Sequence, residues 1–355
     1  MISRRSRGPT LLVAAAALVF AAGCSSAGST AAASPVEQQN LNVAVVPVID
    51  SAGVFIALYD GQFRAEGLNV HFIPAVSSEF VIDQLALSKP GSKSGLDIVC
   101  GGYPSYVEAQ HDWDIGQRPS ASHPSVLAAN LYIFAEGALL APGTGEIYTM
   151  PGSRVRTLAD LRGKTLAINA PHNTLYLQVA AVLAEHGIPP SDVHFVTSYS
   201  FPAMTGALKT GKIDAAVLPE PFASAAEEMD GIVPMADLDQ GATTQFATVG
   251  YAVTKTWAAA HPRTLAAFYR ALEEGQEIAD TNRAAVEKAM EDLPAKPIPL
   301  GVPKQIASIM TVPYFPVSGE PVGSVDAARL QSEVDLMEQF LRFPSFNIKS
   351  MLMGG

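Results

Sequence analysis

The chain has 355 residues, and 34 acidic against 23 basic side chains give it a formal net charge of −11 at pH 7. An acidic surface of this kind makes nucleic acid an unexpected partner. The length allows two domains of ordinary size, and a hydrophobic content of 48% is compatible with well-filled cores.

The first 23 residues have the pattern of a cleavable export signal. Three arginines, the last of them Arg7, precede the apolar run Leu11–Ala22, which is too short to cross a hydrocarbon core of roughly 30 Å. The small residues that lead into Cys24 resemble the bacterial lipobox. The resemblance implies that Cys24 is lipidated and anchors the protein on the extracytoplasmic face of the cell membrane. The alternative is an ordinary secretory signal followed by an incidental cysteine.

Residues 24–40 are predicted to be a flexible tether, because they are small, polar and without a hydrophobic period. A flexible chain of this length reaches roughly 20 Å. Lipidation would use Cys24, so Cys100 would be the one free thiol and no intrachain disulfide is expected.

From Leu41 onward, short β-rich apolar runs alternate with helical stretches, which is typical of βαβ units around mostly parallel sheets. Strands are predicted at residues 41–46, 68–73, 96–100, 127–134, 165–169, 193–196, 215–218 and 248–253. Helices are predicted between them at residues 53–60, 79–87, 174–186, 202–210 and 221–229.

Two passages of the chain are echoed later in it. The passage at residues 65–73 resembles the one at 184–196, and the passage at 84–99 resembles the one at 206–217. Because both pairs occur in the same order, we expect two lobes built on one plan, with an extra polar loop at 88–95 in the first copy.

After about Gly250 the sequence is mainly helical, with helices predicted at residues 255–261, 262–280, 283–291, 305–310 and 325–341. These helices have no sheet of their own, so we expect them to complete the first lobe. The first lobe is therefore predicted to comprise residues 41–132 plus 248–355, and the second residues 133–247. The crossings between lobes are expected near 131–134 and 246–251.

Four segments resemble a known family of binding proteins. They are Phe63–Leu68 (FRAEGL), Thr157–Ala167 (TLADLRGKTLA), Gly211–Ala216 (GKIDAA) and Glu220–Phe222 (EPF). The resemblance is to the ABC-importer solute-binding proteins for nitrate, alkanesulfonates, taurine and thiamine pyrimidine precursors. It implies a type II periplasmic-binding fold, in which two α/β lobes joined by two crossing strands close on a small solute. It also implies an ABC permease as partner, and we expect a monomer.

The candidate ligand-binding residues follow predicted strands, because the carboxyl ends of parallel strands and the helix N-termini after them face one crevice. The same residue types also serve ordinary turns and helix caps. Glu220, between two prolines, is the sharpest candidate; its alternative is an inter-lobe acid or one that favours a helix N-terminus. The candidates are Pro47, Asp50, Ser51, Gly102, Tyr103, Asn173, Thr174 and Glu220.

The candidates lie in four predicted loops, at residues 47–51, 101–105, 170–174 and 219–222. None of these loops contains Arg or Lys, so bidentate recognition of an anion by arginine is not visible in them. This favours a neutral or cationic nitrogenous solute, whereas the family resemblance favours sulfonates.

No catalytic residue, cofactor or metal site is predicted. His111 has no suitably spaced second histidine nearby, and the Gly163–Thr165 segment lacks the earlier glycine of a phosphate loop. Two other functions stay open: an enzyme on the same fold, like those of thiamine pyrimidine synthesis, and a ligand-sensing lipoprotein that reports to a signalling receptor.

Overall fold

The computed structural model describes residues 35–87, 95–117, 128–293, 301–318, 322–323 and 325–353. The predicted export signal, Cys24 and most of the tether lie outside the described residues, as does most of the loop at 88–95. Within the described ranges, no helix is both long enough and apolar enough to cross a membrane.

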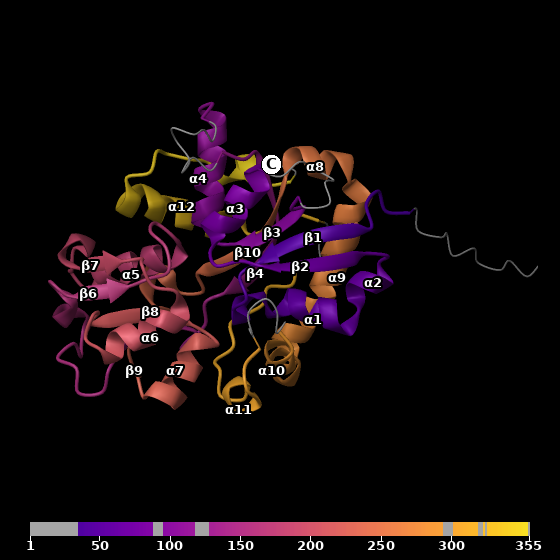
Figure 1. Cartoon of the computed structure of the whole chain (residues 1–355). Coiled ribbons are helices and arrows are strands. Elements are labelled where there is room, and N and C mark those ends of the chain that lie inside the picture. Colours follow the sequence, from indigo (N-terminus) through magenta and orange to yellow (C-terminus); the bar gives the residue numbers. More distant parts are fainter. Residues whose placement is uncertain are drawn as a thin grey trace, which may run out of the picture. The chain divides into compact units, whose positions relative to one another are not determined.

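The first sheet has five strands in the order β2-β1-β3-β10-β4 (Figure 1). β1 runs parallel to both β2 and β3, whereas β10 is antiparallel to β3 and β4. The central strand β3 is buried along its whole length, which explains its continuous apolar sequence. The strands are β1 (Asn40–Val45), β2 (Asn69–Pro74), β3 (Ile98–Gly101), β4 (Leu131–Leu139) and β10 (Ala247–Thr254).

Helices cover both faces of this sheet (Figure 1). Alternate residues of β1 enter two different hydrophobic clusters, because successive strand side chains point to opposite faces. Ala44 packs with residues of α3 (Ser78–Leu87), α4 (Tyr103–Asp114) and α12 (Ala327–Leu341), while Val43 and Val45 pack with residues of α1 and α9. The second face carries η1 (Ile49–Ser51), α1 (Ala52–Asp60), α2 (Gln62–Ala65), α8 (Lys255–Ala260), α9 (Pro262–Thr281), α10 (Arg283–Glu291) and α11 (Lys304–Ala307).

The second sheet also has five strands, in the order β7-β6-β8-β5-β9. β6 is parallel to β7 and β8, and β5 is antiparallel to β8 and β9. The strands are β5 (Gly145–Thr149), β6 (Thr165–Ala167), β7 (His194–Val196), β8 (Ala215–Pro219) and β9 (Val233–Asp237). Its helices are η2 (Leu158–Leu161), α5 (Thr174–Glu185), η3 (Pro190–Asp192), α6 (Phe201–Lys209), α7 (Phe222–Asp230) and η4 (Gly241–Thr243). The last helical turn, η5 (Ile348–Met351), lies beside β4 of the first sheet.

Both sheets follow one plan. In each, the first parallel strand lies between the second and the third, and an antiparallel strand follows the third. The architecture is therefore α/β, with two sheets of the periplasmic-binding type, as the sequence predicts.

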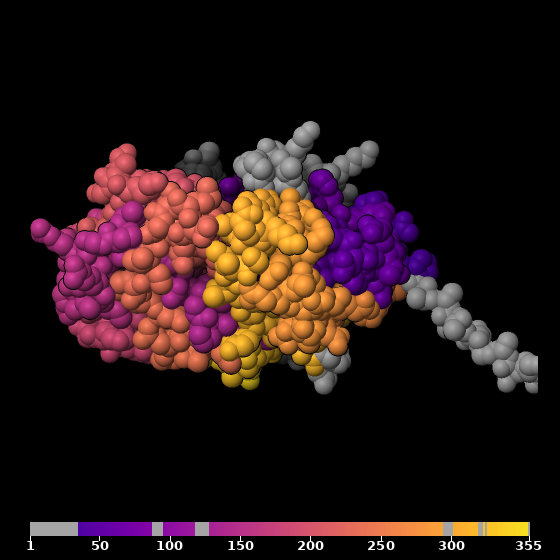
Figure 2. Space-filling view, turned by 90° about the horizontal axis from the view of Figure 1, so that it is seen from below, coloured from indigo at the N-terminus to yellow at the C-terminus, as the bar shows by residue number. Residues whose placement is uncertain are grey.

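The chain passes from the first sheet to the second between Leu139 and Gly145 and returns between Asp237 and Ala247. The first passage comes later than the expected 131–134, because β4 stays paired with β10 as far as Leu139. In Figure 2 the indigo N-terminal surface adjoins the orange C-terminal surface, while the light red middle of the chain gathers at the other end of the view.

Three elements of five or more residues were not predicted: α4, β5 and β9. Tyr103 was expected in a loop but begins α4, where Pro104 is tolerated because the first helical turn needs no N–H from it. β5 escaped prediction, and β9 did so as a half-exposed edge strand that contains Pro234.

Candidate functional site

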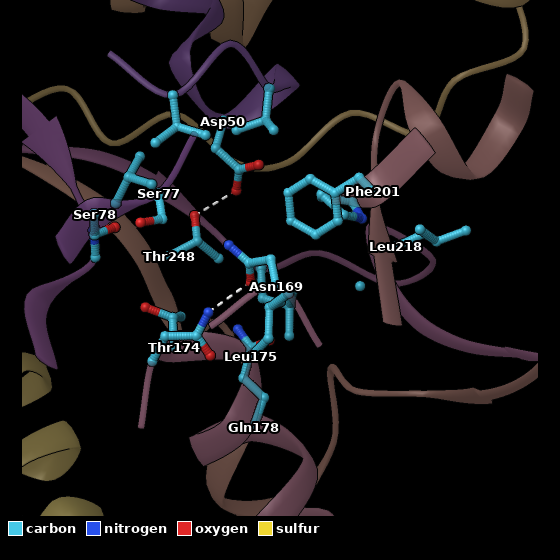
Figure 3. A pocket seen from close by; sticks show the side chains of 18 of the residues that line it. Asp50, Ser77, Ser78, Asn169, Thr174, Leu175, Gln178, Phe201, Leu218 and Thr248 are labelled. Carbon is cyan, nitrogen blue, oxygen red and sulfur yellow. Dashed lines mark hydrogen bonds between the residues drawn. The ribbon is translucent and has the colours of Figure 1, made fainter. Parts of the chain in front are cut away.

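A cavity of about 80 Å³ lies where the loops of the two sheets meet, and we call it the central cavity (Figure 3). Since one water needs about 10–15 Å³ by this measure, the space corresponds to roughly six water-sized positions. In this conformation the central cavity therefore suits a small solute, such as one substituted ring.

The segments after all three parallel strands of each sheet, which are loops and the starts of the helices that follow them, reach the central cavity. In the first sheet these supply Asp50 after β1, Ser77 and Ser78 after β2, and Gly102 after β3. In the second sheet they supply Asn169, Asn173, Thr174 and Gln178 after β6, Phe201 after β7, and the end of β8. This is the crevice at the carboxyl ends of the strands that an open α/β sheet forms.

Four of the eight predicted ligand-binding residues line the central cavity: Asp50, Gly102, Asn173 and Thr174. Pro47 is buried between Val46 and Val48, which both line it. Ser51 has no exposed surface, and its hydroxyl donates to the backbone oxygen of Val46 at 3.1 Å.

Tyr103 and Glu220 are also absent from the wall of the central cavity. The Tyr103 ring is buried, and its hydroxyl donates to the backbone oxygen of Val249 at 3.1 Å. The structure thus turns Tyr103 into the layer between α4 and β10, because a buried hydroxyl needs a partner there.

Glu220 holds three segments together. Its carboxylate accepts hydrogen bonds from the backbone N–H of Ser224 (3.0 Å), the hydroxyl of Ser224 (2.7 Å) and the backbone N–H of Thr311 (3.0 Å). Its backbone oxygen accepts from the N–H of Ile49 at 3.0 Å. Its oxygens are engaged and 3% of the residue is exposed. Glu220 therefore links three segments, which are α7, η1 and the segment after α11, and it does not line the central cavity.

Asp50 is the one carboxylate among the described residues that line the central cavity. Burial raises its pKa above the ordinary range, and the charge of Glu220 adds to this, while a hydrogen bond from the Thr248 hydroxyl opposes it. Figure 3 shows one carboxylate oxygen at Thr248 and the other turned toward the side of Phe201. Asp50 can therefore accept a hydrogen bond from a solute.

The N-terminus of α5 fixes the orientation of two amides. Asn173 caps the helix by accepting the N–H of Tyr176 at 3.0 Å, so its amide nitrogen faces the other way and donates to the side-chain oxygen of Asn169 at 2.6 Å. The amide nitrogen of Asn169 is consequently left to point into the central cavity (Figure 3).

Apolar side chains form the remaining wall. Phe201 lies against Phe222 with ring centroids 5.3 Å apart, which holds its ring in place beside Leu175 and Leu218 (Figure 3). A flat ring can pack against such a surface.

The described part of the cavity wall carries no positively charged side chain. Among its described residues none is Lys, Arg or His. Elsewhere in the described ranges, no group of three or more His, Cys, Asp or Glu side chains could hold a metal ion. Cys100 is buried next to Ser51, and burial raises the pKa of its thiol to about 12.

Two sheets on one plan, with a cavity at their carboxyl ends, define a periplasmic-binding-protein fold of type II. The chain belongs to the NMT1-like family, whose model matches residues 34–293. A comparison with curated proteins finds no match.

Solved structures share the fold. The alkanesulfonate-binding protein SsuA from Xanthomonas axonopodis pv. citri, bound to MOPS, is 16% identical with a TM-score of 0.66, over 89% of this chain and 99% of that chain. The periplasmic nitrate-binding protein NrtA from Synechocystis PCC 6803 is 14% identical with a TM-score of 0.71, over 89% and 85%. An enzyme is also similar: the desulfurization enzyme DSZB is 15% identical with a TM-score of 0.58, over 87% and 94%.

Proposed function

We propose that the protein is an extracytoplasmic solute-binding lipoprotein that captures a small organic solute and presents it, as a monomer, to an ABC permease. The observation that carries the proposal is the central cavity, which both sheets enclose with polar side chains and one apolar wall. The binding-protein relatives and the lipobox-like sequence at Cys24 support the same function.

The two lobes of this binding protein are proposed to coincide with the two sheets. The first lobe then holds residues up to Leu139 and resumes at Ala247, and the second holds the sheet between them. Because the cavity wall takes residues from both, closure of the lobes would bury the solute.

The solute is proposed to be neutral or cationic and to carry nitrogen. Asp50 presents a carboxylate to the cavity, and none of the described wall residues carries a positive charge. Nitrate or a sulfonate would face the negative charge of Asp50 without a cation to offset it, so these anions are the less favoured members of the family's range.

A screen of the purified protein tests the proposal. Thermal unfolding would be followed with pyrimidines, other nitrogen heterocycles, small amides, nitrate and sulfonates, and each hit would be titrated by calorimetry. We expect a nitrogenous solute to raise the unfolding temperature and to bind unchanged. If no small molecule of any class binds, the binding-protein proposal fails.

An enzyme is the second candidate, because DSZB has the same fold. Chromatography of the best solute after incubation with the protein separates the two: a new product would make the protein an enzyme. A ligand-sensing lipoprotein is the third, and genes for a permease and an ATPase beside this one would favour import over sensing.

A further inference from the structure

Two polar side chains of α5, Thr174 and Gln178, line the central cavity. Thr174 and Gln178 lie one helical turn apart, so both project from the same face of the helix. Gln178 is 1% exposed and Thr174 is 9% exposed. The Thr174 hydroxyl oxygen and both the nitrogen and the oxygen of the Gln178 amide are buried, and none of them has a hydrogen-bond partner among the described residues.

Glycines leave room in front of these groups. A Cβ on Gly102 would lie 2.4 Å from the Thr174 hydroxyl oxygen, so any larger residue there would displace it. The amide oxygen of Gln178 lies 4.0 Å from the Cβ position of Gly145. In Figure 3 the Gln178 side chain rises from the helix toward Leu175 and Asn169, which line the cavity.

A buried polar group without a hydrogen-bond partner costs free energy, so these groups favour a solute that supplies the missing partners. The amide needs an acceptor for its N–H and a donor for its oxygen in one plane. An oxyanion offers acceptors alone, and a simple ammonium offers donors alone. A planar group with an N–H beside a carbonyl oxygen or a ring nitrogen offers both.

We propose that Gln178, assisted by Thr174, determines specificity by forming paired hydrogen bonds with an amide-type edge of the solute. Such an edge occurs in a primary amide, urea, lactam or amidine. This inference rests on the proposed binding function and adds the chemical class of the solute. Asp50 would accept a second N–H at another position of the same solute.

Calorimetry on the full protein tests this with named probes. Urea, nicotinamide, uracil and cytosine carry the edge, nitrate and methanesulfonate carry acceptors alone, and methylammonium carries donors alone. We expect at least one edge-bearing probe to bind about tenfold or more tightly than every other probe. Gln178→Met should weaken that probe by about tenfold or more, and Thr174→Val should weaken it severalfold. The control Gln305→Met, on the exposed surface of α11, should bind like the parent.

Thermal unfolding without solute gives an independent readout. Because Gln178→Met removes an unpaired buried amide, the free variant should unfold at the same temperature as the parent or higher. A clearly lower temperature would mean that the amide has a structural partner and would overturn the inference. Unchanged affinity in Gln178→Met, or tightest binding of nitrate or methanesulfonate, would also overturn it while leaving the binding function intact. Absence of binding by every probe, or conversion of a probe to product, would overturn the proposed function itself.

Discussion

Asp50 is the charged residue on which solute binding is expected to depend most. Its pKa is raised in the free protein, and a bound N–H donor or cation would stabilise the charged form. Affinity should therefore be fully present above that raised pKa and should fall as the pH drops through it. Asp50→Asn should weaken binding by about one to two decades, from the roughly 1.5–3 kcal/mol of a charged hydrogen bond, and should remove this pH dependence.

Calorimetric titrations of the parent and of Asp50→Asn across pH 4 to 8 check the fall of affinity at low pH and the loss of this pH dependence in the variant. The free Asp50→Asn variant should be at least as stable as the parent at neutral pH. This is expected because the folded-state pKa of Asp50 is raised. The free energy of unfolding of the parent therefore falls as the pH rises from the unfolded-state pKa of Asp50 to its folded-state pKa. Equal affinity of variant and parent at pH 7 would exclude Asp50 from the solute contacts.

Glu220 is expected to matter for stability. In Glu220→Gln the amide nitrogen must face one of the N–H donors of Ser224 or Thr311, so a hydrogen bond becomes a contact between two donors. We expect a loss of about 1–3 kcal/mol in the free energy of unfolding, measured by urea denaturation. Glu228→Gln, on the exposed side of α7, should change it by less than about 0.5 kcal/mol. A variant with parental stability and weakened binding would instead place Glu220 in contact with the solute.

At the scale of elements, α1 and α9 pack closely through glycine. A Cβ on Gly275 would lie 2.2 Å from the backbone oxygen of Gly53, so the two helices would have to separate. Gly275→Ala should cost about 1–3 kcal/mol of stability. The matched control is Gly206→Ala in α6, where nothing lies within 4 Å and the free energy of unfolding should rise by up to about 1 kcal/mol. Thermal denaturation of both variants checks the pair, and equal effects would refute this account of the α1–α9 contact.

The α3–α4 pair should make stability depend on pH. Burial raises the pKa of Glu108 on α4 to about 7, and repulsion from Glu79 and Asp112 adds to this. Between its unfolded pKa and pH 7 the folded state keeps a proton that the unfolded state has lost, so stability falls as the pH rises. Glu108→Gln should be more stable than the parent at pH 8, by at most about 3 kcal/mol, and similar at pH 4. Urea denaturation at both pH values decides it, and a constant difference would remove Glu108 as the cause.

At the scale of the whole molecule, the proposed lipid anchor decides where the protein resides. In the native host, Cys24→Ser should move it from the membrane fraction to the soluble extracytoplasmic fraction or medium, because the thioether to the lipid cannot form. Immunoblots of the fractions measure this, with Cys100→Ser as a control for loss of a thiol. If Cys24→Ser fractionates with membranes like the parent, the lipobox interpretation is wrong.

Much of the fold could be predicted from local patterns. The helix expected at 283–291 has those bounds in α10, and the strand expected at 215–218 is β8, one residue longer. Apolar periodicity and turn residues are local signals that span only a few neighbouring positions, so they can be recognised in a single sequence. The β9 strand was not predicted because it is a half-exposed edge strand with Pro234, and its partner β5 lies in a distant part of the chain.

The candidate site was predictable only as far as the strand ends. Asp50 and Thr174 reach the central cavity because loops at the carboxyl ends of parallel strands converge. The same rule, applied to the second strand of each sheet, would also have indicated Ser78 and Phe201. No sequence pattern indicated Gln178. It reaches the central cavity because it lies one helical turn after Thr174, on the same face of α5.

The sequence alone therefore determined the α/β class, the order of most of the elements and the resemblance to binding proteins. The tertiary structure decided which side chains face the central cavity. Glu220 shows why: its partner Thr311 lies 91 residues further along the chain. Local periodicity selects helices and strands, but the partner of a buried polar group depends on contacts between distant segments, which exist only once the chain has folded.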